Sequence, residues 1–142
     1  MLSYGADVTA PDDPFVLALP TADRRTAHAF YTALGFDAPG EPADDGVPEP
    51  LQIAVNPGFR LMLIPTGGFG WVTGDHEVAA PGHSECLLSL SCTTPAQVDE
   101  VVGRAERAGG RLVSAPASRP WGYTATFADP DAHLWQVLAT SL

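Results

Sequence analysis

The stretch CLLSLSCTTPAQVDEVVGRAERAGGRL, residues 86–112, reads as a strand, a capped helix and the start of a second strand. Residues 86–92 alternate between apolar and small polar side chains, which is the two-residue period of a strand. Thr94, Pro95 and Gln97 then form a capping-box pattern with proline at the first helical position. The order strand–helix–strand predicts an α+β unit whose helix covers one face of a sheet.

The rest of this second half of the chain supplies the partners of that sheet. The helix has an apolar face at the i, i+3, i+4 and i+7 spacing, and Gly109 favours its end. Asp129, Pro130 and Asp131 predict a tight turn, because Pro presets one dihedral and Asp side chains bond nearby amides. The predicted strands are RLVSAP (111–116), YTATFAD (123–129) and HLWQVL (133–138).

The first half of the chain repeats this order of elements with little residue identity. A strand at FVLALP (15–20) precedes the helix TADRRTAHAFYTALGF (21–36), which Thr21 or Asp23 caps and Gly35 ends. A hairpin follows, with LQIAV (51–55) and RLMLI (60–64) joined at Asn56-Pro57-Gly58. Helices cover one face of each sheet, so the other faces must curl around each other or around a ligand. Two segments rich in Pro or Gly are predicted to be loops, residues 38–50 and 65–84.

Composition limits the classes of partner. With 7 basic residues, all Arg, and 17 acidic residues, the formal net charge is −10. A chain without a basic patch is not expected to bind nucleic acid or anionic membranes. No apolar run is long enough to span a bilayer, and the N-terminal residues lack the pattern of a secretory signal, so a cytoplasmic location is expected. Cys86 and Cys92 lie about 20 Å apart on the predicted strand and are expected to stay reduced.

Three motifs resemble the vicinal oxygen chelate superfamily, the group of glyoxalase I, bleomycin-resistance proteins and extradiol dioxygenases. They are AHAFYTALGF (27–36), the second strand–helix–strands unit, and DPDAHLWQVL (129–138). The resemblance implies an α+β fold in which two βαβββ modules form an open, cup-shaped mixed sheet, usually in a homodimer. The implied divisions are an N-terminal arm at 1–13 and one domain at 14–140. Within that domain, module one covers about 14–66, a linker or lid 67–84, and module two about 85–140.

The resemblance also places the divalent-metal ligands of the superfamily's enzymes on this chain. The aligned positions are Val16, Ile64, Leu87 and Gln136. Three of these side chains have no lone pair, and a lone neutral amide does not hold a metal against water. Glu85 shares the strand face of Leu87 but brings the number of ligands only to two, fewer than a catalytic ion needs. We therefore predict no metal and no other cofactor.

Most of the candidate ligand-binding residues are aromatic or apolar, and the others are one glutamine and one glutamate. Gln136 either binds a ligand at the floor of the cup or bonds neighbouring groups and water. Phe69 and Trp71 in the Gly-rich segment either close over a ligand, or form a hydrophobic plug over the cup or a dimer contact. Trp135 and His133 are predicted to face the helix side of the sheet. Their expected roles there are core packing and a structural hydrogen bond. The predicted ligand-binding residues are Gln136, Trp71, Phe69, Trp121, Tyr123, Met62 and Glu85.

Three functions remain open on the sequence. The first is a metal-free protein that binds a small organic ligand, aromatic or cationic in character, in a cup made or completed by a homodimer. The second is a glyoxalase-like lyase or isomerase with atypical ligands, for which no general base is placed by the sequence. The third is a non-catalytic dimer whose cup is filled by its own side chains. The catalytic residues are therefore left unassigned.

Overall fold

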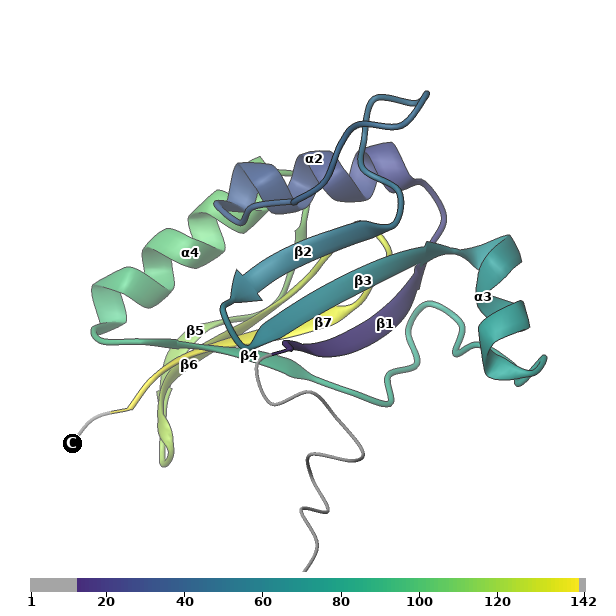
Figure 1. Ribbon diagram of the computed structural model, residues 1–142. Coiled ribbons are helices and arrows are strands. Elements are labelled where there is room, and N and C mark those ends of the chain that lie inside the picture. The colour runs from purple at the N-terminus through teal and green to yellow at the C-terminus, as the bar shows by residue number, and fades with distance from the viewer. Residues whose placement is uncertain (1–12, 141–142) are drawn as a thin grey trace, which may run out of the picture.

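Two mixed β-sheets and three helices make up the described part of the chain, residues 13–140 of the computed structural model (Figure 1). Most of the predicted N-terminal arm, 1–13, lies outside these residues. In chain order the elements are β1 (Phe15–Thr21), α2 (Arg24–Leu34), β2 (Leu51–Asn56), β3 (Phe59–Pro65), α3 (Thr66–Thr73), β4 (Leu88–Cys92), α4 (Pro95–Arg107), β5 (Arg111–Arg119), β6 (Gly122–Ala128) and β7 (Leu134–Ala139).

The two long helices begin and end at the residues that the sequence indicates. The Asp23 carboxylate accepts from the backbone N–H groups of Arg25 and Thr26 at the start of α2. At the start of α4, the Thr94 hydroxyl accepts from Gln97 N and the Gln97 side chain accepts from Thr94 N. Gly35 ends α2 with a φ of 116°, a left-handed conformation that favours glycine. These signals are local, because each acts within a few residues of its own position.

In each sheet the first strand of a module lies parallel to its last strand. The orders are β1-β3-β2 and β4-β7-β6-β5, and all pairs other than β1–β3 and β4–β7 are antiparallel. The predicted α+β class with open mixed sheets is confirmed. The first sheet has one strand fewer, because the proline-rich segment after α2 forms only isolated bridges, one of them between Asp37 and Ala54. Proline has no N–H to donate to a strand ladder.

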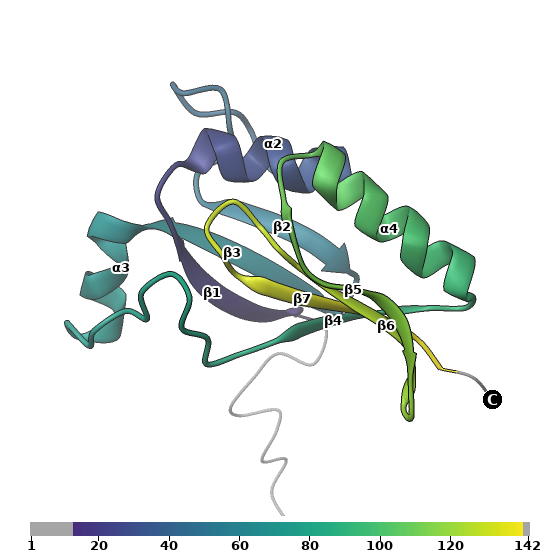
Figure 2. The same cartoon turned by 180° about the vertical axis from the view of Figure 1, so that it is seen from behind.

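Both sheets share one hydrophobic core with α2 and α4. Phe30 lies 6.2 Å from Phe127, and Tyr31 lies 6.0 Å from Trp135, both measured between ring centroids. All four side chains are buried. Figures 1 and 2 show the two sheets as layers one behind the other, with both helices along the same side. Contacts across the modules therefore make one packed body.

The opposite faces of the two sheets point away from this core. Leu61, Leu63 and Val137 are buried, and side chains alternate along a strand. Met62 of β3 therefore lies on the outer face of the first sheet, and Gln136 of β7 on the outer face of the second. Both side chains are partly exposed. Both side chains therefore point away from the core that the two sheets share.

The Gly-rich segment after β3 differs from its prediction as a loop, because Thr66–Thr73 forms the helix α3. The Thr66 hydroxyl donates to the carbonyl of Thr21, 3.1 Å away, and so fixes the start of α3 to the end of β1. Gly74 ends the helix in the left-handed conformation. Tertiary contacts thus override the low helix propensity of three glycines. No helix among the described residues is long and apolar enough to cross a membrane.

Candidate ligand-binding site

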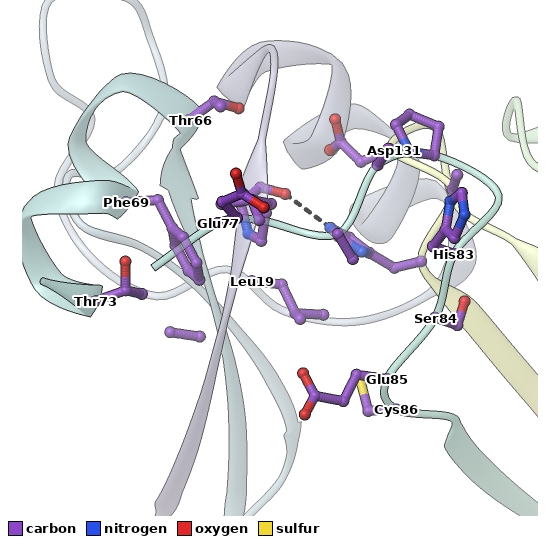
Figure 3. Close-up of a pocket in the computed structure, with 18 of the residues that line it drawn as sticks. Leu19, Thr66, Phe69, Thr73, Glu77, His83, Ser84, Glu85, Cys86 and Asp131 are labelled. Atoms are coloured by element: carbon purple, nitrogen blue, oxygen red, sulfur yellow. Dashed lines mark hydrogen bonds between the residues drawn. The ribbon is translucent and has the colours of Figure 1, made fainter. Parts of the chain in front are cut away.

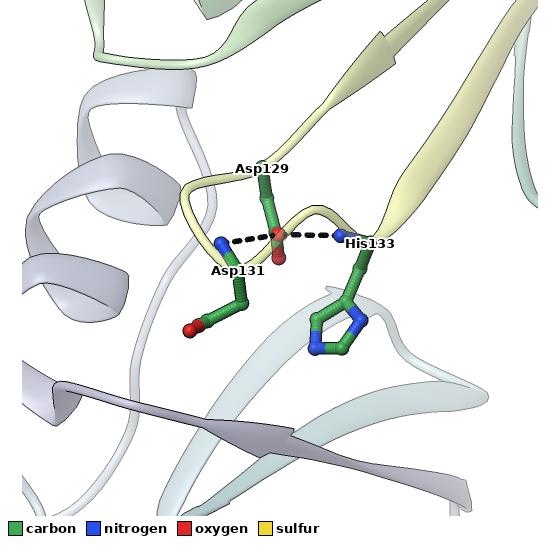
Figure 4. A group of neighbouring side chains, drawn as sticks. All are labelled: Asp129, Asp131 and His133. Carbon is green, nitrogen blue, oxygen red and sulfur yellow. Dashed lines mark hydrogen bonds between the residues drawn. The ribbon is translucent and has the colours of Figure 1, made fainter. Parts of the chain in front are cut away.

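The turn between β6 and β7 is organised by the Asp129 carboxylate. Its Oδ1 accepts the backbone N–H groups of Asp131, at 2.9 Å, and of His133, at 2.8 Å (Figure 4). Ala132 takes a positive φ of 70° within the turn. An Asp side chain that bonds amides further along the chain stabilises a tight turn. The predicted turn is confirmed.

The other oxygen of Asp129 is bound inside the core. Oδ2 accepts from the Tyr31 phenol, whose oxygen in turn accepts from Trp135 Nε1 at 3.1 Å. Burial raises the pKa of Asp129 above its usual value, although the Tyr31 hydrogen bond opposes this. Burial, and next the charge of Asp129, raises the pKa of Tyr31 well above 10.0, so the phenol keeps its proton and donates. This network is structural.

Asp131 and His133 attach the same turn to the first module. The Asp131 carboxylate accepts from Thr21 Oγ1 at 2.6 Å and from Ala22 N at 2.9 Å. His133 Nε2 lies 2.7 Å from the carbonyl oxygen of Pro20. Because a carbonyl only accepts, Nε2 is the donor in this bond. The predicted structural hydrogen bond of His133 is therefore present.

Gln136 lies on the outer face of the second sheet, between two neighbouring strands. Its register partners are Ser89 on β4 and Thr126 on β6. Its Nε2 donates to Ser89 Oγ and its Oε1 accepts from Thr124 Oγ1, each at 3.1 Å. Of the two alternatives for Gln136, the bonds to neighbouring groups are thus present. One N–H of its amide and further lone pairs of Oε1 are left for solvent or a ligand.

A hollow of about 590 Å³ is lined by β1, by α3 and by residues 76–86, which are called the linker from here on. Figure 3 shows the Phe69 ring and the Glu77 and Glu85 carboxylates around Leu19. Further hydrocarbon comes from Leu17, Ala18 and Val78, and the turn before β7 forms one wall. The other polar lining residues are Thr66, Thr73, His76, His83, Ser84, Asp131 and His133. The hollow therefore has apolar walls with carboxylates at two places on the linker.

The comparisons with known proteins agree with this architecture. The sequence profile described as "Glyoxalase/Bleomycin resistance protein/Dioxygenase superfamily" matches residues 14–137. The chain belongs to this superfamily. The resemblance to vicinal oxygen chelate proteins is thereby confirmed, and no curated protein sequence matches the chain significantly.

Solved structures of the superfamily's fold superpose over most of the chain. A hypothetical protein from S. aureus is 27% identical, with a TM-score of 0.76, and the match covers 88% of this chain and 92% of that one. A glyoxalase-related enzyme from Fulvimarina pelagi is 23% identical, with a TM-score of 0.75 and coverage of 88% and 86%. An antibiotic binding protein from a Streptomyces species is 24% identical, with a TM-score of 0.62 and coverage of 94% and 99%.

The divalent metal that the superfamily implies does not fit this chain. The strand registers pair Ser89 with Gln136 in the second module and Ala18 with Met62 in the first. Gln136 therefore lies beside Ser89 rather than Leu87, two residues from the predicted alignment. A serine hydroxyl and an amide, already bonded to each other, face one outer surface, and Ala18 and Met62 offer no oxygen or nitrogen ligand. Three converging ligands are absent from these positions.

The cluster at the β6–β7 turn also fails this test. Asp129, Asp131 and His133 each offer a ligand atom within 4.8 Å of the others. However, every carboxylate oxygen of the two aspartates accepts a hydrogen bond within the protein, and Asp129 is buried. A cation would have to compete with these donors, which hold the turn and the two modules together. The cluster's role is structural.

The predicted ligand-binding residues are divided among several places. Phe69 and Glu85 line the hollow. Met62 and Gln136 lie on the two outer sheet faces, and Tyr123 donates to Asp99 Oδ1 at 2.8 Å. The side chains of Trp71 and Trp121 are exposed, at 87% and 58%. For all seven residues, contact with a ligand stays a prediction.

Several lining residues were not among the predicted ones. Leu17 and Leu19 belong to β1, and their apolar character also fits the core, so the sequence gives no sign that they border a hollow. Glu77 and His83 stand in the Gly- and Pro-rich linker. Their grouping with Glu85 in HEVAAPGHSE (76–85) is a signal that could have been used, since a loop bearing several ionisable residues is a common place for a site.

Proposed function

We propose that this protein binds a small organic molecule, without a metal, in the hollow between β1, α3 and the linker 76–86. The observation that carries the proposal is the combination of size and lining. A volume of about 590 Å³ falls within the range of small-molecule sites, about 300–1,000 Å³. Such sites have mostly apolar walls with polar groups that orient the ligand, and here β1 and Phe69 supply apolar walls while the linker supplies most of the polar groups.

The elements around the hollow support binding rather than chemistry. The walls at Leu17, Leu19 and Phe69 come from a strand and a helix that are anchored to each other through Thr66 and Thr21. Anchored apolar walls lower the entropy cost of holding a ligand. A lyase or isomerase of the superfamily's metal-dependent type is not supported, because the aligned positions lack the ligands. The solved antibiotic binding protein with the same fold is consistent with a binding role.

A homodimer is the proposed partner arrangement. The outer faces of both sheets carry apolar residues that are at least partly exposed, Val16 and Met62 on the first sheet and Leu138 on the second, and each face is open in the single chain. A second copy that placed one of its sheets against such a face would enclose a second space lined by Met62 and Gln136. Light scattering at several concentrations tests the stoichiometry. A cytoplasmic location and the absence of nucleic-acid and membrane partners stay predictions.

A matched pair of variants on one helix tests the binding role. Phe69 of α3 lines the hollow, whereas Val72 of the same helix is exposed and does not. We expect a thermal-shift screen of small aromatic compounds to give hits whose stabilisation falls in Phe69→Ala and persists in Val72→Ala. A ligand at 100 times its Kd stabilises by about 2.7 kcal/mol. Equal stabilisation of both variants would place the ligand elsewhere.

A further inference from the structure

We propose that the hollow prefers ligands in which a positively charged nitrogen group, an amine or amidinium, is attached to an apolar or aromatic body. This rests on the proposed function and adds the class of ligand. The charged side chains that line the hollow are Glu77, Glu85 and Asp131, and no Arg is among the lining residues. The chain has no Lys at all. An approaching cation therefore meets carboxylates without an opposing fixed cation.

The two glutamates are free to bind such a group. Among residues 13–140, neither Glu77 nor Glu85 takes part in an ion pair or a side-chain hydrogen bond. Figure 3 shows both carboxylates at the hollow. Both residues are also exposed, so their carboxylates can turn toward a cation that rests against the apolar walls. Hydrogen bonds from a charged nitrogen would also be among the stronger ones.

Some side-chain hydrogen-bond donors of the hollow are used within the protein, whereas His76, His83 and Ser84 also line it and form no side-chain hydrogen bond among residues 13–140. The Thr66 hydroxyl donates to Thr21 O, and the Thr73 hydroxyl donates to Gly70 O. His133 uses its Nε2–H on Pro20 O. The unpaired charged groups of the lining are the Glu77 and Glu85 carboxylates, which act as acceptors. A cation would meet these two carboxylates as attractive partners, whereas an anion would be repelled by the same two charges.

The apolar part of the ligand is recognised by the opposite wall. The Phe69 ring, Leu17 and Leu19 supply an aromatic and two aliphatic surfaces. Burying such surface is favourable because it removes apolar area from water. The face of a Phe ring also attracts a cation that lies within about 6 Å of its centre. One wall thus favours hydrocarbon and the linker favours positive charge, which together select an amphipathic cation.

Three probes of the same shape test this preference. Benzamidine, benzamide and benzoate share a ring and a planar head group, and carry a positive charge, no charge and a negative charge. Each is titrated to millimolar concentration into the ¹⁵N-labelled full chain, and amide chemical shifts are followed. We expect benzamidine to shift resonances of β1, α3 and the linker with a Kd about tenfold below that of benzamide. Benzoate should give no saturable shifts there.

Charge-removing variants locate the effect. Glu77→Gln and Glu85→Gln should each raise the Kd of benzamidine several-fold and leave that of benzamide unchanged. Glu100→Gln, on α4 outside the hollow, makes the same change in net charge and should affect neither. Because all three glutamates are exposed, the variants should fold normally.

The outcomes separate this inference from the proposed function. If benzamide and benzoate bind the hollow as tightly as benzamidine, the preference for cations is wrong and the binding role stands. If Glu100→Gln weakens benzamidine as much as Glu77→Gln and Glu85→Gln do, the attraction is only that of the net charge, and the inference is also wrong. If no probe shifts resonances of the hollow, both this inference and the proposed site are contradicted.

Discussion

The phenol of Tyr31 donates a hydrogen bond to Oδ2 of Asp129, so a residue of α2 is bonded to the turn before the last strand of the second module. The same phenol oxygen accepts from Trp135 Nε1. Two residues further on, Asp131 accepts from Thr21 and Ala22 of the first module. The polar residues of ADPDAHLWQVL (128–138) thus serve mainly to join the two modules.

Tyr31→Phe should destabilise the protein more than Tyr123→Phe, although each removes a tyrosine–aspartate hydrogen bond. Tyr31 is fully buried, and its loss leaves Asp129 Oδ2 and Trp135 Nε1 without this partner. An unsatisfied buried group costs about 1–3 kcal/mol. The Tyr123–Asp99 bond is exposed, so its loss should cost at most about 0.5 kcal/mol. Urea denaturation measures both, and equal losses would contradict the structural role of the network.

The raised pKa of Asp129 predicts a specific pH dependence. Burial raises its pKa in the folded state above the value of 3.8 for a free side chain. At a pH between the pKa of Asp129 in the unfolded state and its higher pKa in the folded state, the folded state binds more protons than the unfolded state. The free energy of unfolding therefore falls as pH rises through this window. We expect the free energy of unfolding of the wild type to fall there relative to that of Asp129→Asn. Urea denaturation at a series of pH values measures the difference, and a constant difference would refute the assignment.

Two glycines near α4 should respond oppositely to alanine. A Cβ on Gly110 would lie 2.8 Å from both the Ala128 carbonyl oxygen and Phe30 Cε1, whereas one on Gly103 would meet only the end of the Arg107 side chain, at 3.2 Å. We expect Gly110→Ala to cost about 1–3 kcal/mol through overpacking. Gly103→Ala, inside the helix, should be neutral or stabilise by up to about 1 kcal/mol. Thermal unfolding measures both, and a stable Gly110→Ala variant would show that β5 can shift away from α2.

The sequence predicts those parts of the fold that depend on local signals. Asp23, Thr94 and Gly35 act within a few residues of their own position, so the helix ends could be read directly. The turn at Asp129 is local in the same way. Strand periodicity likewise separates the core position Trp135 from its neighbour Gln136.

The features that the sequence does not predict depend on contacts between distant residues. The helix α3 contains three glycines and is anchored through Thr66 to Thr21, a contact across 45 positions. The hollow arises where α3, β1 and the linker meet, so Leu19 and Glu77 become neighbours only after folding. The outward direction of both Met62 and Gln136 also follows from how the modules pack, which periodicity alone does not determine.

The purified protein should neither retain nor require a divalent metal. Of the paired positions Ala18–Met62 and Ser89–Gln136, only the second carries polar side chains, and its hydroxyl and amide are bonded to each other. A divalent site needs at least three converging ligands. We therefore expect treatment with EDTA, or addition of Ni²⁺ or Zn²⁺, to leave the Tm unchanged in a sample without an affinity tag. Elemental analysis after dialysis should give far less than one equivalent of metal. A full equivalent that is retained in the wild type and lost in Gln136→Ala would show that the outer sheet face holds a metal after all.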